Sequence, residues 1–175
     1  MRNKWIKRLF PFLFVFLLPW PIAHATSVNE LPNGETATVE VAEPSARPSY
    51  TAFGRAIGGV SNPGDLFYID ATGSASQIKV TLYLTNAQQL VRHYQYLILN
   101  TGIYVENDED EWERATASDG TPIPKAIISM QNGRVSFLLP GDARYKIAID
   151  SGCFYCHRAP ADSSSMSPQF SLEVI

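Results

Sequence analysis

Apolar and polar residues alternate most regularly between positions 78 and 84, in the run Ile78-Lys79-Val80-Thr81-Leu82-Tyr83-Leu84. Successive side chains of a β-strand point to opposite faces, so this pattern predicts a strand with one buried face. Shorter apolar segments of the same kind lie at 66–69, 93–99, 103–105, 126–130, 135–139, 145–149 and 170–174. The chain is therefore predicted to consist mainly of strands.

The composition of these segments favours the same conclusion. They are rich in β-branched and aromatic residues, and turn-forming residues separate them. Only residues 87–94 could form a helix, of one or two turns. Strands without intervening helices predict an all-β fold, an antiparallel β-sandwich.

The first 25 residues have the order of an export signal. Arg2, Lys4, Lys7 and Arg8 precede an apolar run at 9–22, and Ala23-His24-Ala25 follows it. The apolar run is shorter than the roughly 20 residues that a membrane-spanning helix needs. We expect a signal peptide cleaved after Ala25, export to the periplasm, cell surface or medium, and no membrane insertion after cleavage.

The remaining chain divides by composition. Residues 26–64 contain few large apolar side chains and four prolines, which predicts a loosely structured leader with possible edge strands at 36–41 and 50–57. Residues 65–175 carry the regular pattern and are predicted to form the β-sandwich domain. The pair Asn132-Gly133 between two apolar runs predicts a hairpin with a type I′ turn, which needs positive φ at both residues.

The segment Leu138-Leu139-Pro140-Gly141-Asp142-Ala143-Arg144-Tyr145-Lys146-Ile147 resembles the tyrosine corner of fibronectin type III and other immunoglobulin-like domains. In those domains a turn leads to a Tyr that opens the penultimate strand. The resemblance implies an immunoglobulin-like sandwich in which the Tyr145 hydroxyl bonds to the chain just upstream. It also implies that residues 151–168 form a long loop between the last two strands.

That predicted loop contains both cysteines of the chain, in Cys153-Phe154-Tyr155-Cys156-His157. The motif matches c-type haem attachment, in which Cys153 and Cys156 form thioethers and His157 ligates the iron. The sixth ligand would be Met166, His93 or Met130. A local Cys153–Cys156 disulfide in an oxidising compartment is the other main interpretation. A redox-active pair, or a metal site that adds His93, is a third.

The second unusual segment is the acidic run 106–113. Clustered carboxylates can bind calcium, but the spacing lacks the register of an EF-hand loop. A solvated turn is the better interpretation, with Trp112 expected to anchor the next strand in the core.

Charge and motifs limit the classes of function. Residues 26–175 contain ten Lys and Arg against 17 Asp and Glu, a net charge of −7, so nucleic acid is a poor partner. The sequence has no nucleophile-elbow motif and no phosphate-binding glycine loop, so we expect a non-enzyme. The first hypothesis is an exported module that binds a protein or cell-surface partner, or assembles with itself, through Phe154 and Tyr155. The alternative is an electron-transfer protein with one haem c.

Overall fold

Two antiparallel sheets form the framework of the protein. The computed structural model describes residues 26–54, 56–157 and 167–175, and in these residues one sheet has nine strands and the other three. Their helical content is the single turn α1 (Ala87–Leu90), inside the segment expected to be helical. The predicted all-β class is therefore confirmed. No helix in these residues is long and apolar enough to cross a membrane.

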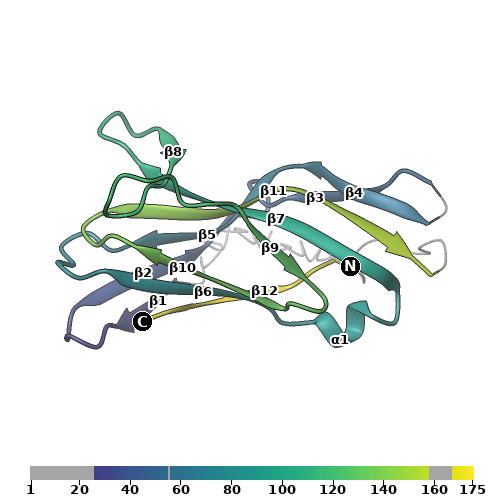
Figure 1. Ribbon diagram of the computed structural model, residues 1–175, viewed down its shortest axis with the longest axis horizontal. Helices are drawn as coiled ribbons and strands as arrows, with labels where there is room; N and C mark the ends of the chain where they lie inside the picture. Colours follow the sequence, from purple (N-terminus) through teal and green to yellow (C-terminus); the bar gives the residue numbers. More distant parts are fainter. Residues whose placement is uncertain (1–25, 55, 158–166) are drawn as a thin grey trace, which may run out of the picture.

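Strand β11 (Arg144–Cys156) organises the nine-stranded sheet. Its first half pairs with β5 (Gly64–Asp70) and its second half with β4 (Ile57–Asn62), while β7 (Tyr94–Glu106) pairs along its other edge. The sheet continues outward through β2 (Thr36–Val41), β1 (Thr26–Glu30), β3 (Ser49–Ala52), β8 (Trp112–Arg114) and β9 (Ala126–Ser129). Figure 1 shows β7 and β11 running along the molecule, with β8 near one end and β3 and β4 near the other.

The three-stranded sheet has β6 (Ile78–Leu84) at its centre, between β10 (Arg134–Leu139) and β12 (Phe170–Val174). The alternating run predicts β6 with its observed bounds, and Ile78, Val80 and Leu82 are fully buried. Of the polar residues between them, Lys79 is exposed, whereas Thr81 is buried and its hydroxyl lies 3.0 Å from that of Ser136. The contact joins paired residues of β6 and β10 on the face of the sheet opposite Val80 and Leu82.

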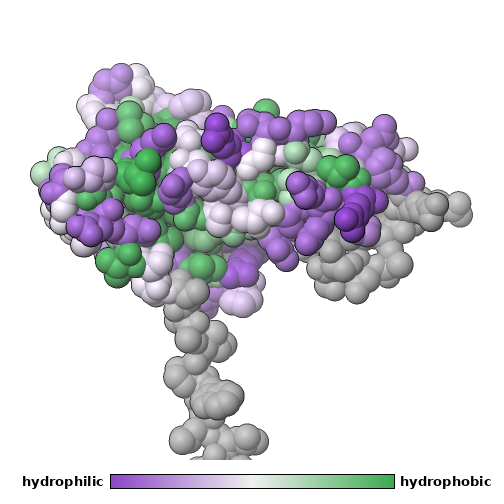
Figure 2. All heavy atoms as spheres, turned by 90° about the horizontal axis from the view of Figure 1, so that it is seen from below, coloured by the Kyte–Doolittle hydropathy of each residue, from purple (hydrophilic) through white to green (hydrophobic). Residues whose placement is uncertain are grey.

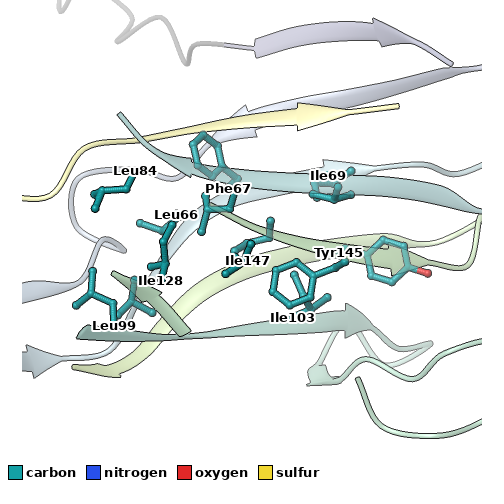
Figure 3. Close-up of a cluster of buried hydrophobic side chains, with 14 of the residues drawn as sticks. Leu66, Phe67, Ile69, Leu84, Leu99, Ile103, Ile128, Tyr145 and Ile147 are labelled. Carbon is teal, nitrogen blue, oxygen red and sulfur yellow. The ribbon is translucent and has the colours of Figure 1, made fainter. Parts of the chain in front are cut away.

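Side chains from both sheets form one hydrophobic cluster. Figure 3 shows Ile69, Leu99, Ile103, Ile128 and Ile147 of the larger sheet lying together with Leu84 of β6. Each fully buried Ile or Leu contributes roughly 1.5 to 3 kcal/mol. Outside the core, Figure 2 shows hydrophobic spots between hydrophilic residues, which is ordinary for a folded surface.

Residues 26–64, predicted to be a loosely structured leader, carry β1 to β4 of the nine-stranded sheet. Segment 36–41 forms a strand with the predicted bounds, but β2 lies between β1 and β5 and not at an edge. Ala37 and Val39 belong to the core. Small apolar residues are enough here because alternate positions of β2 face the larger side chains of the cluster.

The predicted hairpin around Asn132-Gly133 is wrong. Strand β9 pairs with β7 and strand β10 pairs with β6, so the connection crosses from one sheet to the other. Among the described glycines, positive φ occurs at Gly34, Gly73 and Gly120 but not at Gly133, and Asn132 also lacks it. The Gly133 carbonyl accepts a hydrogen bond from the Leu84 N–H at 2.7 Å, which ties the crossing to β6.

The turn before β11 has the hydrogen bond that the tyrosine-corner resemblance implies. The Tyr145 hydroxyl donates to the Pro140 carbonyl at 2.8 Å, and the Tyr145 side chain is buried. Gly141 is required between them because a Cβ there would lie 2.3 Å from the carbonyl oxygens of Ser74 and Ser76. Asp142 takes the positive φ of this turn, and its carboxylate accepts from the Gly73 N–H at 2.8 Å.

Candidate functional site

The Cys-His motif lies at the end of a strand and not in a loop. Strand β11 continues to Cys156, with β4 on one side of this stretch and β7 on the other. The predicted loop 151–168 is therefore wrong for residues 151–156. Gly152 permits the continuation, since a Cβ there would lie 2.5 Å from Leu99 Cδ2 and 2.8 Å from the Ile98 carbonyl oxygen.

The two thiols are free, so the predicted disulfide is wrong. Cys153 is exposed and Cys156 is buried. Residues three apart on a strand point to opposite faces and are about 10 Å apart along it. A disulfide needs Cα atoms within roughly 7 Å, and the strand pairing prevents that approach. Burial also raises the pKa of the Cys156 thiol.

The residues of the motif do not fit a covalently attached haem. Both thioether sulfurs must reach one porphyrin edge, whereas the Cys153 side chain lies on the outer face of the sheet and that of Cys156 faces the core. His157 is exposed, and its N–H donates to the His93 carbonyl at 2.9 Å, so the two histidines meet through their backbones. Met130 packs against the core and Met166 lies outside the described residues. No group of three metal-ligating side chains occurs in the described part of the chain.

Phe154 and Tyr155, expected together in a binding loop, lie on opposite faces of β11. The Phe154 ring is buried edge-on against Tyr94, with ring centroids 5.1 Å apart. It occupies the space where a side chain of Gly58 would be, since a Cβ there would lie 2.1 Å from Phe154 Cζ. Tyr155 lies on the outer face and stacks on Tyr96 at 5.9 Å. Phe154 is therefore a core residue, and only Tyr155 is available for contact.

The outer-face residues that pair with Tyr155 and Cys153 across the strands are uncharged and, apart from glycine, all apolar or aromatic. Tyr155 pairs with Tyr96 of β7 and Ile57 of β4, and Cys153 pairs with Ile98 of β7. The Phe53 ring lies over Gly59, the partner of Cys153 in β4, with Cε2 3.1 Å from the position of a Cβ. The exposed fractions are 68% for Phe53, 53% for Ile57 and 38% for both Tyr96 and Ile98. We call these six residues, Phe53, Ile57, Tyr96, Ile98, Cys153 and Tyr155, the apolar patch.

The opposite end of the same face is charged. The acidic run forms a turn between β7 and β8, in which the Asn107 side chain accepts from the N–H groups of Glu109 and Glu111. Trp112, expected in the core, lies half-buried at the surface with its ring centroid 5.8 Å from that of Tyr68. The Lys146 ammonium lies 5.1 Å from the Trp112 ring and forms an ion pair with Asp65.

A second polar network lies beside it. The Tyr104 hydroxyl donates to Asp150 at 2.7 Å, and Lys125 Nζ lies 2.7 Å from the same carboxylate. The Arg114 guanidinium lies over the Tyr104 ring at 5.4 Å. Gly102 leaves room for this arrangement because a Cβ there would lie 2.3 Å from Arg114 Nη1. Burial, followed by the hydrogen bond to Asp150, raises the pKa of Tyr104.

Sequence reasoning missed this network. Its members lie on β7, β8, β11 and the segment before β9. Only strand register brings them together, and no local spacing encodes that register. The alternation of polar residues on β7 and β11 was the one signal that could have indicated their shared face.

A cavity lies between β3, β5 and the residues before β12. It measures about 590 Å³ and is lined by Val41, Arg47, Pro48, Tyr50, Leu66, Phe67, Thr85, Ser167, Pro168, Gln169 and Phe170. The Tyr50 hydroxyl is buried without a hydrogen bond, and burial raises its pKa. No nucleophile with an adjacent base lines this cavity.

Comparison with known proteins gives no further assignment. The sequence matches no protein-family model and no curated protein.

Proposed function

We propose that this protein is an exported, non-enzymatic immunoglobulin-like β-sandwich module that self-associates through its apolar patch. The main support is the patch itself. Its residues Phe53, Ile57, Tyr96 and Ile98 are all at least 38% exposed. The strands that hold the patch, β4, β11 and β7, pair side by side. Contiguous exposed apolar surface on a folded domain marks an interaction site. The sequence of residues 1–25 supports export.

The immunoglobulin-like assignment has two supports. The Tyr145 to Pro140 hydrogen bond has the direction and position of a tyrosine corner. The antiparallel sheets also share one hydrophobic cluster, as the two layers of a sandwich do. Such a fold hosts many functions, so the argument for binding depends on the surface and not on the fold.

The distribution of charge favours a second copy of the chain as the occupant. None of the six patch residues is charged, whereas the acidic run lies at the far ends of β7 and β11, about 30 Å away at a strand rise of 3.3 Å per residue. Two copies can therefore join their patches about a two-fold axis while their acidic ends point apart. Burying the patch in a dimer therefore removes none of its side chains' charges from water, because none of them is charged.

Sedimentation velocity over a range of concentrations tests this proposal. We expect wild-type protein to form a dimer with a dissociation constant of about 1 to 100 μM, and Ile98→Lys to remain monomeric because it buries an unpaired ammonium. Leu138→Lys is the matched control, since Leu138 is 54% exposed on the other sheet. A monomeric wild type at about 100 μM, the weak end of that range, overturns self-association.

A thiol cross-linking experiment places the interface. A short bis-maleimide should join two copies through exposed Cys153, while buried Cys156 reacts slowly. Cys153→Ser should abolish the cross-link. A dimer that forms but does not cross-link through Cys153 would place the interface on another surface.

A single haem c does not fit this motif, because the strand holds Cys153 and Cys156 on opposite faces.

A further inference from the structure

The cavity between β3, β5 and the residues before β12 has the size of a ligand site. Its volume of about 590 Å³ lies within the range of roughly 300 to 1,000 Å³ that small-molecule sites occupy. Apolar side chains from both sheets line it, among them Val41 of β2, Phe67 of β5 and Phe170 of β12. We call it the inter-sheet cavity.

A bulge in β5 adds an apolar side chain to the wall of the inter-sheet cavity. The pairing of β5 with β11 shifts between Ile147 and Ala148, which leaves Leu66 as an extra residue of β5. Leu66 and Phe67 are both buried and both line the cavity, although neighbouring residues of a regular strand face opposite ways. Figure 3 shows the two side chains within the same buried group. Bulges re-aim side chains beside functional sites, and this one widens the apolar wall.

Hydrogen bonds and close packing hold the walls of the cavity in place. On one side the Arg47 Nε–H donates to the Ala42 carbonyl at 2.9 Å. The backbone at Arg47 also packs on Gly64 of β5, where a Cβ would lie 2.3 Å from the Arg47 carbonyl carbon. On the other side the Thr85 N–H and hydroxyl both donate to the Gln169 carbonyl, at 2.8 and 3.1 Å. The cavity is therefore preformed, which lowers the entropic cost of binding.

The polar groups of the wall indicate the chemistry of the occupant. Arg47 is the one charged residue among those that line the cavity, and its bond to Ala42 uses one of five N–H donors. Guanidinium groups bind carboxylates through pairs of parallel N–H bonds. The Tyr50 hydroxyl is buried in the wall without a hydrogen bond, which is rare in a folded protein. A mainly apolar cavity with these two polar groups suits an amphipathic molecule.

We propose that the inter-sheet cavity binds a small organic acid with an apolar body, such as a medium-chain fatty acid. The carboxylate pairs with Arg47, and the alkyl chain lies against Leu66, Phe67 and Phe170. An apolar molecule with a cationic head would bring like charges together at Arg47. Ligand binding is independent of self-association, since none of the six residues of the apolar patch lines the cavity.

Isothermal titration calorimetry with decanoate tests the proposal, and decanol is the uncharged ligand with the same chain length. We expect decanoate to bind at one site per chain with a dissociation constant of about 10 to 100 μM, as the ligand efficiency of small molecules allows. Decanol should bind about tenfold more weakly, because it lacks the charge that pairs with Arg47.

Paired variants locate the ligand. Arg47→Gln should weaken decanoate binding about tenfold and leave decanol binding unchanged. Arg134→Gln is the matched control, because Arg134 lies exposed on β10 and does not line the cavity. It should change either affinity by less than about twofold. Val41→Trp places a large ring in the cavity and should abolish the binding of both ligands, with circular dichroism to verify the fold.

Three outcomes overturn the proposal. The first is the absence of saturable decanoate binding up to about 1 mM. The second is equal affinity for decanoate and decanol, or an equal effect of Arg47→Gln and Arg134→Gln. The third is loss of decanoate binding in Ile98→Lys, which would place the ligand on the apolar patch. If Val41→Trp does not fold, the two arginine variants still decide, and a monomeric wild type changes none of these outcomes.

Discussion

The outer face of the nine-stranded sheet has two contrasting ends built on the same two strands. At one end β7 and β11 supply Tyr104, Lys146 and Asp150, which are linked by hydrogen bonds, ion pairs and ring contacts. At the other end they supply Ile98 and Tyr155, which are apolar or aromatic and uncharged. A single strand pair can thus carry both a polar network and a surface suited to association.

A bulge marks the change between the two ends. The pairing of β11 with β7 shifts register between Ile149 and Ser151. An extra residue in one strand re-aims the side chains that follow it. After the shift, Cys153 and Tyr155 lie outward while Phe154 and Cys156 face the core. The irregularity therefore decides which residues of the cysteine motif are exposed.

The largest effect should separate Phe154 from Tyr155 at the apolar end. Phe154→Ala should destabilise the protein by about 3 to 4 kcal/mol, because it empties a buried aromatic site. Tyr155→Ala should cost less than about 1 kcal/mol, since its ring lies on the outer face. Urea unfolding followed by circular dichroism measures both. If both variants lose the same small amount of unfolding free energy, Phe154 does not occupy a buried site and its placement in the core is wrong.

At the charged end, Asp150→Ala should cost about 2 kcal/mol. It leaves Tyr104 without an acceptor and Lys125 without its carboxylate, in a site where the Asp150 side chain is only 12% exposed. The control is Asp70→Ala, because Asp70 is 52% exposed and 4.0 Å from its cation. It should cost less than about 0.5 kcal/mol. If the two variants have the same urea midpoint, the network adds no stability.

The smallest effect concerns the turn that begins β11. Tyr145→Phe should lower the free energy of unfolding by about 1 to 1.5 kcal/mol, since it removes one partly buried hydrogen bond to Pro140 and keeps the ring. Thermal unfolding by calorimetry measures the loss. A midpoint equal to wild type would count against the tyrosine corner as a stabilising feature.

The sequence allowed prediction of individual strands better than of their partners. The period-2 alternation of residues 78–84 identified β6 fully, and residues 138–147 indicated the Tyr145 hydrogen bond. The hairpin predicted at Asn132-Gly133 was wrong because an Asn-Gly pair can also connect strands of two different sheets, as it does here. Gly102 and Gly152 lie inside β7 and β11, where each provides space for a neighbouring strand or side chain. Sequence patterns describe one strand at a time, whereas these positions depend on the packing of several.

The candidate site shows the same limit. The cysteine motif was found, but its chemistry was misjudged because an i, i+3 pair is close in a turn and distant on a strand. Trp112 was noticed as an anchor, although its contact with Tyr68 depends on the register of β7 with β8.

The position of β11 also governs the order in which the chain can fold. Its partners β4, β5 and β7 are all complete by residue 106, but none can pair with β11 until residues 144–156 are available. Contacts between residues so far apart in sequence close large loops, which slows folding. Until then the edges of β4 and β5 that later pair with β11 remain open to other strands. A nascent chain that stops before residue 144 therefore lacks the strand that joins β4 and β3 to the rest of the sheet, and leaves these strand edges open to pairing with other chains.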